Sequence, residues 1–189
     1  MKFFIIGMHC SGKQELFDIL SNQNISCAKL FSNVQIDDNR YEFFNDKEMV
    51  EIFENKAYIF MKEYNDYAFN TFEGLSLYEY DNNDVLILSP DQFVAIPQHF
   101  LNEEICVIWL DDAKNIRKQR YDEEKRTYGF NEREEFERRD IEEFIRIIYN
   151  TKKIKVLYFT REDINRVSSI VYACVKYPEL VNNFEKTFK

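Results

Sequence analysis

The chain contains little glycine, proline or histidine. Only 4 glycines and 3 prolines occur in 189 residues, and the 2 histidines are His9 and His99. Because glycine and proline interrupt regular backbone, their scarcity predicts that most of the chain lies in helices and strands. Two histidines are too few for the ligand sets of typical zinc sites. We therefore expect a chain rich in regular structure and without zinc chemistry.

The sequence also lacks paired cysteines and long apolar runs. Its 4 cysteines lie far apart and form no C-x-x-C pair, so we expect reduced thiols, as in a cytoplasmic protein. The apolar start of the chain, residues 2–8, is too short to span a membrane and has no signal-type cleavage site. These absences predict a protein without a signal peptide, a membrane segment or a membrane partner.

Positive charge is in short supply. The chain has 25 Lys and Arg residues against 34 Asp and Glu residues, for a net charge of -9. This balance disfavours a nucleic-acid partner, although a local cluster of basic side chains can still bind a small anion. Aromatic residues are abundant, with 18 Phe and 12 Tyr, and 45% of the chain is hydrophobic. This composition excludes disorder and predicts one domain, residues 1–189, with a sizeable core.

Strand-like and helix-like segments alternate along the chain. Continuous apolar runs predict buried strands, and the segments between them show helical spacing, which together favour a parallel sheet with helices on both sides. The expected strands of this sheet are residues 2–6, 84–89, 104–110 and 153–159, and the expected helices are residues 13–20, 112–126, 131–149 and 161–177. Further strands are expected at 24–31 and within 56–72, with a helix at 45–55.

The first turn has the spacing of a phosphate-binding loop, G-x-x-x-x-G-K, between an apolar strand and a helix. In this setting main-chain N–H groups surround phosphate oxygens at the positive end of the helix, and Lys13 reaches toward the β- and γ-phosphates. The alternative is a chance glycine turn, and the flanking strand and helix favour nucleotide binding. The residues that we predict to bind ATP are Gly7, Met8, His9, Cys10, Ser11, Gly12, Lys13 and Gln14.

Gln14 stands where such loops usually carry Ser or Thr, whose hydroxyl binds Mg²⁺. The amide of Gln14 offers a neutral carbonyl oxygen on a longer arm. Gln14 is therefore a weak candidate for holding Mg²⁺, either directly or through water. We still expect ATP and Mg²⁺ as the cofactors.

The order of these segments resembles the guanylate kinase-like nucleoside monophosphate kinases over roughly residues 1–150, most closely the divergent, phage-type members. The resemblance is carried by GMHCSGK, RYEFFNDKEMVEIFENKAYI, YNDYAFNT, DVLILSPDQ, CVIWLDD, RKQRYDEEKR and EREEFERRDIEEF. It implies a three-layer P-loop NTPase fold with a mostly parallel sheet flanked by helices. It also implies an NMP-binding insertion at about residues 30–80, an arginine-bearing helical lid at about residues 117–139, and a bacterial or phage-infected host cytoplasm.

Carried over residue by residue, the resemblance assigns two sets of side chains. The catalytic set, which would hold ATP and neutralise the transferring phosphoryl group, is Lys13, Arg117, Arg120, Arg126, and Arg138 or Arg139. The set that would bind the acceptor nucleotide is Lys29, Tyr41, Tyr67, Asn70 and Asp91. The alternative for the arginines is a solvated helix pair held by ion pairs, such as Glu135 with Arg139.

Two features of the family are missing. The T-T-R-x-P-R segment, which supplies two arginines to the acceptor phosphate, is replaced by CAKLFSN, and the guanine-reading glutamate falls at Ile59 or Phe60. One function consistent with the resemblance is ATP-dependent phosphoryl transfer to a nucleoside or deoxynucleoside monophosphate, by a monomer or homodimer. The alternatives are a catalytically weak binding module with the same fold, and an ATPase or kinase with another acceptor. The retained Lys13 and the arginine spacing favour the monophosphate kinase.

Overall fold

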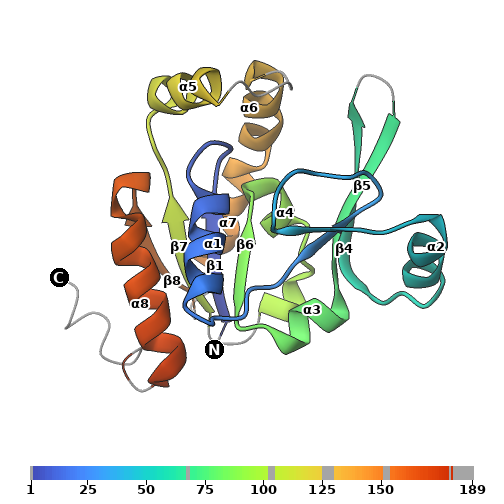
Figure 1. The fold of residues 1–189 in the computed structure, drawn as a ribbon, viewed down its shortest axis with the longest axis horizontal. Helices are drawn as coiled ribbons and strands as arrows, with labels where there is room; N and C mark the ends of the chain where they lie inside the picture. Colours follow the sequence, from blue (N-terminus) through green and yellow to red (C-terminus); the bar gives the residue numbers. More distant parts are fainter. Residues whose placement is uncertain are drawn as a thin grey trace.

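A parallel sheet forms the centre of the computed structural model, which describes residues 2–66, 69–101, 105–124, 130–150, 154–178 and 180. Its strand order is β6-β1-β7-β8, and each neighbouring pair is parallel. The bounds of these strands are Lys2–Gly7 for β1, Val85–Leu88 for β6, Ile105–Leu110 for β7 and Ile154–Phe159 for β8. Figure 1 shows this sheet with helices on both sides.

Both faces of the sheet are buried, which explains the continuous apolar runs in its strands. Alternate residues of β1 point into two separate cores: Phe3 and Ile5 into one, Phe4 and Ile6 into the other. The first core is completed by α1 (Lys13–Asn22) and α8 (Ile164–Lys176). The second is completed by α4 (Pro90–Val94) and α7 (Ile141–Asn150). The predicted three-layer α/β fold with a mostly parallel sheet is confirmed.

A second, mixed sheet lies beside the first and has the strand order β3-β2-β5-β4. Its elements, including the helices that follow β3 and β5, are β2 (Leu30–Ser32), β3 (Tyr41–Phe43), α2 (Asp46–Glu54), β4 (Tyr58–Asp66), β5 (Phe69–Ser76) and α3 (Leu77–Asn82). The long hairpin of β4 and β5 is antiparallel, and Glu73 pairs with Lys62 on one side and Ser32 on the other. These three residues form one row across the sheet, so their side chains share a face.

The strand expected at residues 24–31 is wrong in its bounds. Cys27 forms only an isolated bridge to Val85, and the Ala28 N–H donates to the Val85 carbonyl at 2.8 Å. The chain then leaves the edge of the main sheet and enters the second sheet as β2, at Leu30. Residues 24–31 therefore contribute to both sheets, although their apolar pattern predicts a single strand.

The charged region forms α5 (Lys114–Glu123) and α6 (Phe130–Arg139), which lie at the end of the main sheet where β1 leads into α1 (Figure 1). The helix expected at 131–149 is two helices, α6 and α7, because the chain bends at Asp140. The Asp140 carbonyl accepts the hydrogen bond of the Phe144 N–H at 2.8 Å, and its carboxylate lies 3.4 Å from Lys62 Nζ. Short 3-10 turns occur at Gln98–Leu101 and Arg161–Asp163.

Among the described residues, none of the helices has both the length and the apolar composition that crossing a membrane requires.

A substitution of Gly74 tests how closely Phe31 and Phe60 pack around this position in the second sheet. A Cβ atom at this position would collide with the buried Phe31 ring and would lie 2.5 Å from the Phe60 carbonyl oxygen. We expect Gly74→Ala to lower the free energy of unfolding by about 2–3 kcal/mol, because neither neighbour can move cheaply. Urea denaturation measures this change. Thr71→Ala, in the same strand at a partly exposed position, is the control, and an equal effect of the two substitutions would contradict the packing argument.

Candidate functional site

The loop between β1 and α1 has the backbone of an anion-binding turn. Cys10 and Gly12 adopt left-handed conformations, with φ of 58° and 93°. At Gly12 a Cβ atom would also lie 2.8 Å from Arg161 Cγ, so a glycine is required there for both its φ and its space. Left-handed residues of this kind are typical of turns whose N–H groups face an anion. In this structure the Ser11 N–H donates to the Met8 carbonyl at 3.2 Å.

Lys13 lies against this loop. Its ammonium group donates to the carbonyl oxygens of Gly7 at 2.5 Å and Met8 at 2.7 Å. The residue is buried although it is charged. These bonds hold the charge at the inner side of the turn, at the start of α1, where the positive end of the helix adds to it.

Helix α6 covers the loop through two glutamates spaced three residues apart. The Glu137 carboxylate accepts from the main-chain N–H of His9 at 2.8 Å and lies 3.1 Å from the His9 Nδ1 atom. The Glu134 carboxylate lies 3.9 Å from His9 Nε2. The Phe130 ring packs edge-on against the imidazole, with 4.5 Å between the ring centroids. The loop is therefore lined by carboxylates on the side of α6.

The structure brings Arg117 and Arg120 of α5 to this same place. Arg117 donates to both carboxylate oxygens of Glu134, at 2.5 and 3.0 Å, and is buried. Burial alone would lower the pKa of Arg117 and raise that of Glu134, but their mutual attraction outweighs burial and shifts both in the opposite directions. Arg120 donates to Asp112 at 2.5 Å and to the carbonyl oxygen of Cys10 at 3.3 Å. One arginine thus contacts the loop directly, and the other contacts the helix that covers it.

The other expected lid arginines lie elsewhere. The side chains of Arg138 and Arg139 are 68% and 69% exposed. Arg139 pairs with Glu135 at 3.0 Å, which is the arrangement of a solvated helix, and Arg138 lies 3.7 Å from Glu134. Arg126 falls outside the described residues.

Tyr41 belongs to a buried polar cluster at the junction of the two sheets. Its hydroxyl donates to Glu73 at 3.0 Å, and the side-chain amide of Gln92 donates to Glu73 at 3.0 Å and to the Tyr41 hydroxyl at 3.1 Å. The three residues come from β3, β5 and α4. Sequence reasoning missed Glu73, although a single acidic residue within the apolar run Phe72–Leu75 is the signal that could have identified it.

Arg40 is the second residue that sequence reasoning missed. Its guanidinium is buried and binds Asp38 through three hydrogen bonds of 2.6 to 3.1 Å. Its Nη1 atom is buried without a hydrogen-bond partner. Burial would lower the pKa of Arg40, but the negative charges of Asp38 and Glu73 together with the Tyr41 oxygen raise it. A fixed positive charge with an unused donor therefore stands beside Tyr41.

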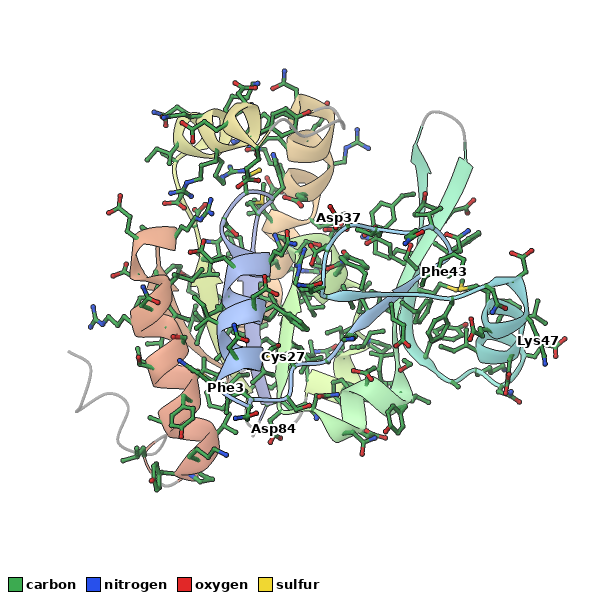
Figure 2. All side chains as sticks on the ribbon, viewed as in Figure 1. Phe3, Cys27, Asp37, Phe43, Lys47 and Asp84 are labelled. Carbon is green, nitrogen blue, oxygen red and sulfur yellow. The ribbon has the colours of Figure 1, made fainter. Side chains whose placement is uncertain are left out.

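The segment between β2 and β3 connects this cluster to α1, the helix that follows the loop. The pKa of Asp38 is lowered, because Arg40 and, more weakly, Lys13 outweigh the raising effect of burial. The neighbouring Asn39 donates to Asp18 of α1 at 2.9 Å. In Figure 2 this segment, marked by Asp37, lies between the main sheet and the β4–β5 hairpin. Asp38 is therefore hydrogen-bonded to Arg40 and is also influenced by the positive charge of Lys13.

Of the other expected substrate residues, Asp91 is fully buried. Its carboxylate accepts from the Tyr64 hydroxyl at 2.7 Å and from Ser89 at 2.5 Å, and it lies 3.2 Å from Lys62 Nζ. These contacts tie β4 to the start of α4. Lys29 is exposed, and its main-chain N–H donates to Glu79 of α3. Tyr67 lies outside the described residues, and of Asn70 only the backbone, in β5, is described.

The described residues contain no group of three or more His, Cys, Asp or Glu side chains that could hold a metal ion. Mg²⁺ usually keeps several waters and binds through substrate phosphates and one or two protein ligands. Gln14, half-buried in the first turn of α1 next to the loop, fits the role of such a single weak ligand. A Mg²⁺ ion that arrives on a nucleotide is therefore compatible with these residues.

A substitution of Asp38 tests whether an ion pair holds Arg40 in place. Asp38→Asn removes the charge that faces the guanidinium, and breaking a buried pair in this way costs about 3–5 kcal/mol. We expect the free energy of unfolding in urea at neutral pH to fall by that amount. Asp37→Asn removes the same charge from the exposed neighbouring residue, and we expect it to change stability by less than about 0.5 kcal/mol.

The difference in unfolding free energy between wild type and Asp38→Asn should also depend on pH. Because the folded protein lowers the pKa of Asp38 below its ordinary value, the ion pair stabilises the fold fully above that ordinary value. The contribution is lost as the pH falls through the lowered pKa. The difference in stability between wild type and Asp38→Asn should therefore shrink below about pH 4. A difference that is undiminished in strong acid would show that the ion pair is not its cause.

The fold is similar to that of a guanylate kinase. The solved structure of guanylate kinase from Anaplasma phagocytophilum matches with a TM-score of 0.53 over 92% of this chain and 85% of that chain, at 15% sequence identity. No family model matches the sequence, and no curated protein matches it. The comparison supports the guanylate kinase-like fold and gives no support to a greater similarity with phage-type members. What it establishes is a mixed α/β fold with a mostly parallel central sheet, shared with a nucleotide kinase.

Proposed function

We propose that the protein transfers a phosphoryl group from ATP to a nucleoside or deoxynucleoside monophosphate. The observation that carries this proposal is the position of Asp38, which is hydrogen-bonded to Arg40, just before β3, and whose pKa is lowered by the charges of Arg40 and, more weakly, of Lys13 at the start of α1. Two cationic groups, one suited to a donor phosphate and one to an acceptor phosphate, thus act on the same carboxylate. Phosphoryl transfer depends mainly on positioning and on neutralising charge, so such convergence is what the reaction requires.

In the proposed reaction the loop N–H groups and Lys13 hold the triphosphate of ATP. Arg40, through its unused Nη1 donor, and the Tyr41 hydroxyl bind the acceptor phosphate. Arg120, which contacts the loop, and Arg117, which contacts the helix that covers the loop, would neutralise the transferring group. Gln14 would be the single weak protein ligand of a Mg²⁺ ion bound with the nucleotide, and that ion would supply further neutralisation of phosphate charge. Arg40 therefore takes over, from a different position, the role of the missing T-T-R-x-P-R arginines.

The second candidate function is a binding module that keeps the fold and has little activity. It is favoured by Gln14 and by the engagement of Arg117 with Glu134 and of Arg120 with Asp112. An arginine that is already paired must exchange its carboxylate for a phosphate before it can act. Turnover measurements distinguish the kinase from the binding module. They also detect an ATPase, or a kinase that uses another acceptor.

The first test is a screen of the common nucleoside and deoxynucleoside monophosphates with ATP and Mg²⁺. We expect turnover with at least one acceptor and a loss of roughly a hundredfold or more in Lys13→Met, which keeps the packed stem but removes the charge. ATP consumption and product formation are measured together, so hydrolysis without an acceptor is also detected. Turnover that survives the substitution would show that Lys13 does not have the proposed role, and the absence of turnover with every acceptor would leave the binding module as the function.

The second test concerns Arg40. Arg40→Lys keeps the charge toward Asp38 but loses the planar fork and its unused donor. We expect the KM for the acceptor to rise about tenfold, as loss of a charged hydrogen bond predicts, while the KM for ATP changes less than about twofold. Lys29→Ala, which removes the other candidate cation, is the comparison. If Lys29→Ala raises the acceptor KM and Arg40→Lys does not, the acceptor phosphate binds to Lys29 instead.

A further inference from the structure

Helix α6 places a carboxylate on the phosphate-binding loop. Glu137 is 1% exposed, and its Oε2 atom accepts the main-chain N–H of His9 at 2.8 Å. The N–H groups of such a loop are the donors that bind phosphate oxygens, and a carboxylate oxygen offers the same negative charge and the same hydrogen-bond geometry. Glu137 therefore occupies a hydrogen-bonding position that the loop would otherwise offer to a bound anion.

Two neighbouring residues show that α6 is docked on the loop along one face. Phe130 is buried against the His9 ring, and Glu134, four residues on, approaches the same ring at 3.9 Å. Glu137 follows after three more residues, so the three side chains lie on the same side of the helix. His9 Nε2 is buried and has no hydrogen-bond partner. The contact between α6 and the loop is thus a packed, buried interface that contains one polar atom without a hydrogen-bond partner, His9 Nε2.

We propose that Glu137 is an autoinhibitory latch: it holds α6 on the loop in the nucleotide-free protein, and a polyphosphate must displace it in order to bind. The proposal rests on the proposed function only in that the loop binds phosphate. A latch that is closed nine times out of ten weakens the apparent affinity about tenfold. Its displacement also moves Glu134 away from the loop, which frees Arg117 to face the incoming phosphates.

The probe is inorganic tripolyphosphate in the presence of a chelator, titrated by calorimetry into the full-length protein. Glu137→Gln keeps the size and the acceptor oxygen of the side chain and removes its charge. We expect this variant to bind tripolyphosphate about tenfold more tightly than wild type. Glu135→Gln is the matched control, because it removes the same charge from an exposed position of the same helix. We expect its affinity to equal that of wild type.

The main-chain amide of His9 provides a second readout. In wild type its NMR signal should report a strong hydrogen bond and slow exchange with solvent, and Glu137→Gln should shift it and speed its exchange. Glu135→Gln should leave it unchanged. An unchanged His9 signal in Glu137→Gln would overturn the latch. So would an affinity for tripolyphosphate that is equal to or weaker than that of wild type, or no binding by either protein.

These outcomes are separate from those that test the enzyme. Tighter tripolyphosphate binding by Glu137→Gln, in a protein that phosphorylates no monophosphate, would contradict the proposed kinase function and support the proposed latch. Turnover with an acceptor, combined with unaltered tripolyphosphate binding by Glu137→Gln, would contradict the proposed latch and support the proposed kinase function. Because the probe carries no base and no metal, neither acceptor binding nor Mg²⁺ binding influences it.

Discussion

Charge buried in a protein must be paired, and this constraint fixes the arrangement of the elements around the loop. Arg117 is buried because Glu134 meets it with two hydrogen bonds, so α5 and α6 are held together at the end of the main sheet. The buried carboxylate of Glu137 is in turn satisfied by the loop itself. Replacing one member of such a network leaves its partner uncompensated, at a cost of several kcal/mol. The helices at this end of the sheet therefore depend on the loop, as much as the loop depends on them.

A second set of polar contacts, partly buried, joins the second sheet to the helices packed on the main sheet. Lys62 on β4 lies 3.2 Å from Asp91 at the start of α4 and 3.4 Å from Asp140 at the bend between α6 and α7. Through Lys62 the second sheet thus contacts the residue that follows the end of α6, the helix that covers the loop. In a phosphoryl-transfer enzyme this connection would link the acceptor region to the region that closes over ATP.

Much of the fold could be predicted from local pattern. The strands of the main sheet are recognisable because a strand buried on both faces must be apolar throughout, and α1 follows the loop because Leu16, Phe17 and Leu20 repeat at helical spacing. The bend at Asp140 was not predictable, because a tertiary contact with Lys62 accompanies it. The strand expected at 24–31 failed for the same kind of reason, since one apolar segment serves two sheets.

The sequence by itself determined the parallel sheet and the loop with its lysine, because both depend on residues that are neighbours in the chain and on backbone rules that act locally. Only the tertiary structure decided which charges meet. Tyr41 and Glu73 could not be recognised as partners from the sequence because 32 positions separate them, and Glu137 lies 128 positions from the His9 amide that it binds. Spacing along the chain carries no information about such contacts, since burial and compensation of charge are settled only when the elements pack.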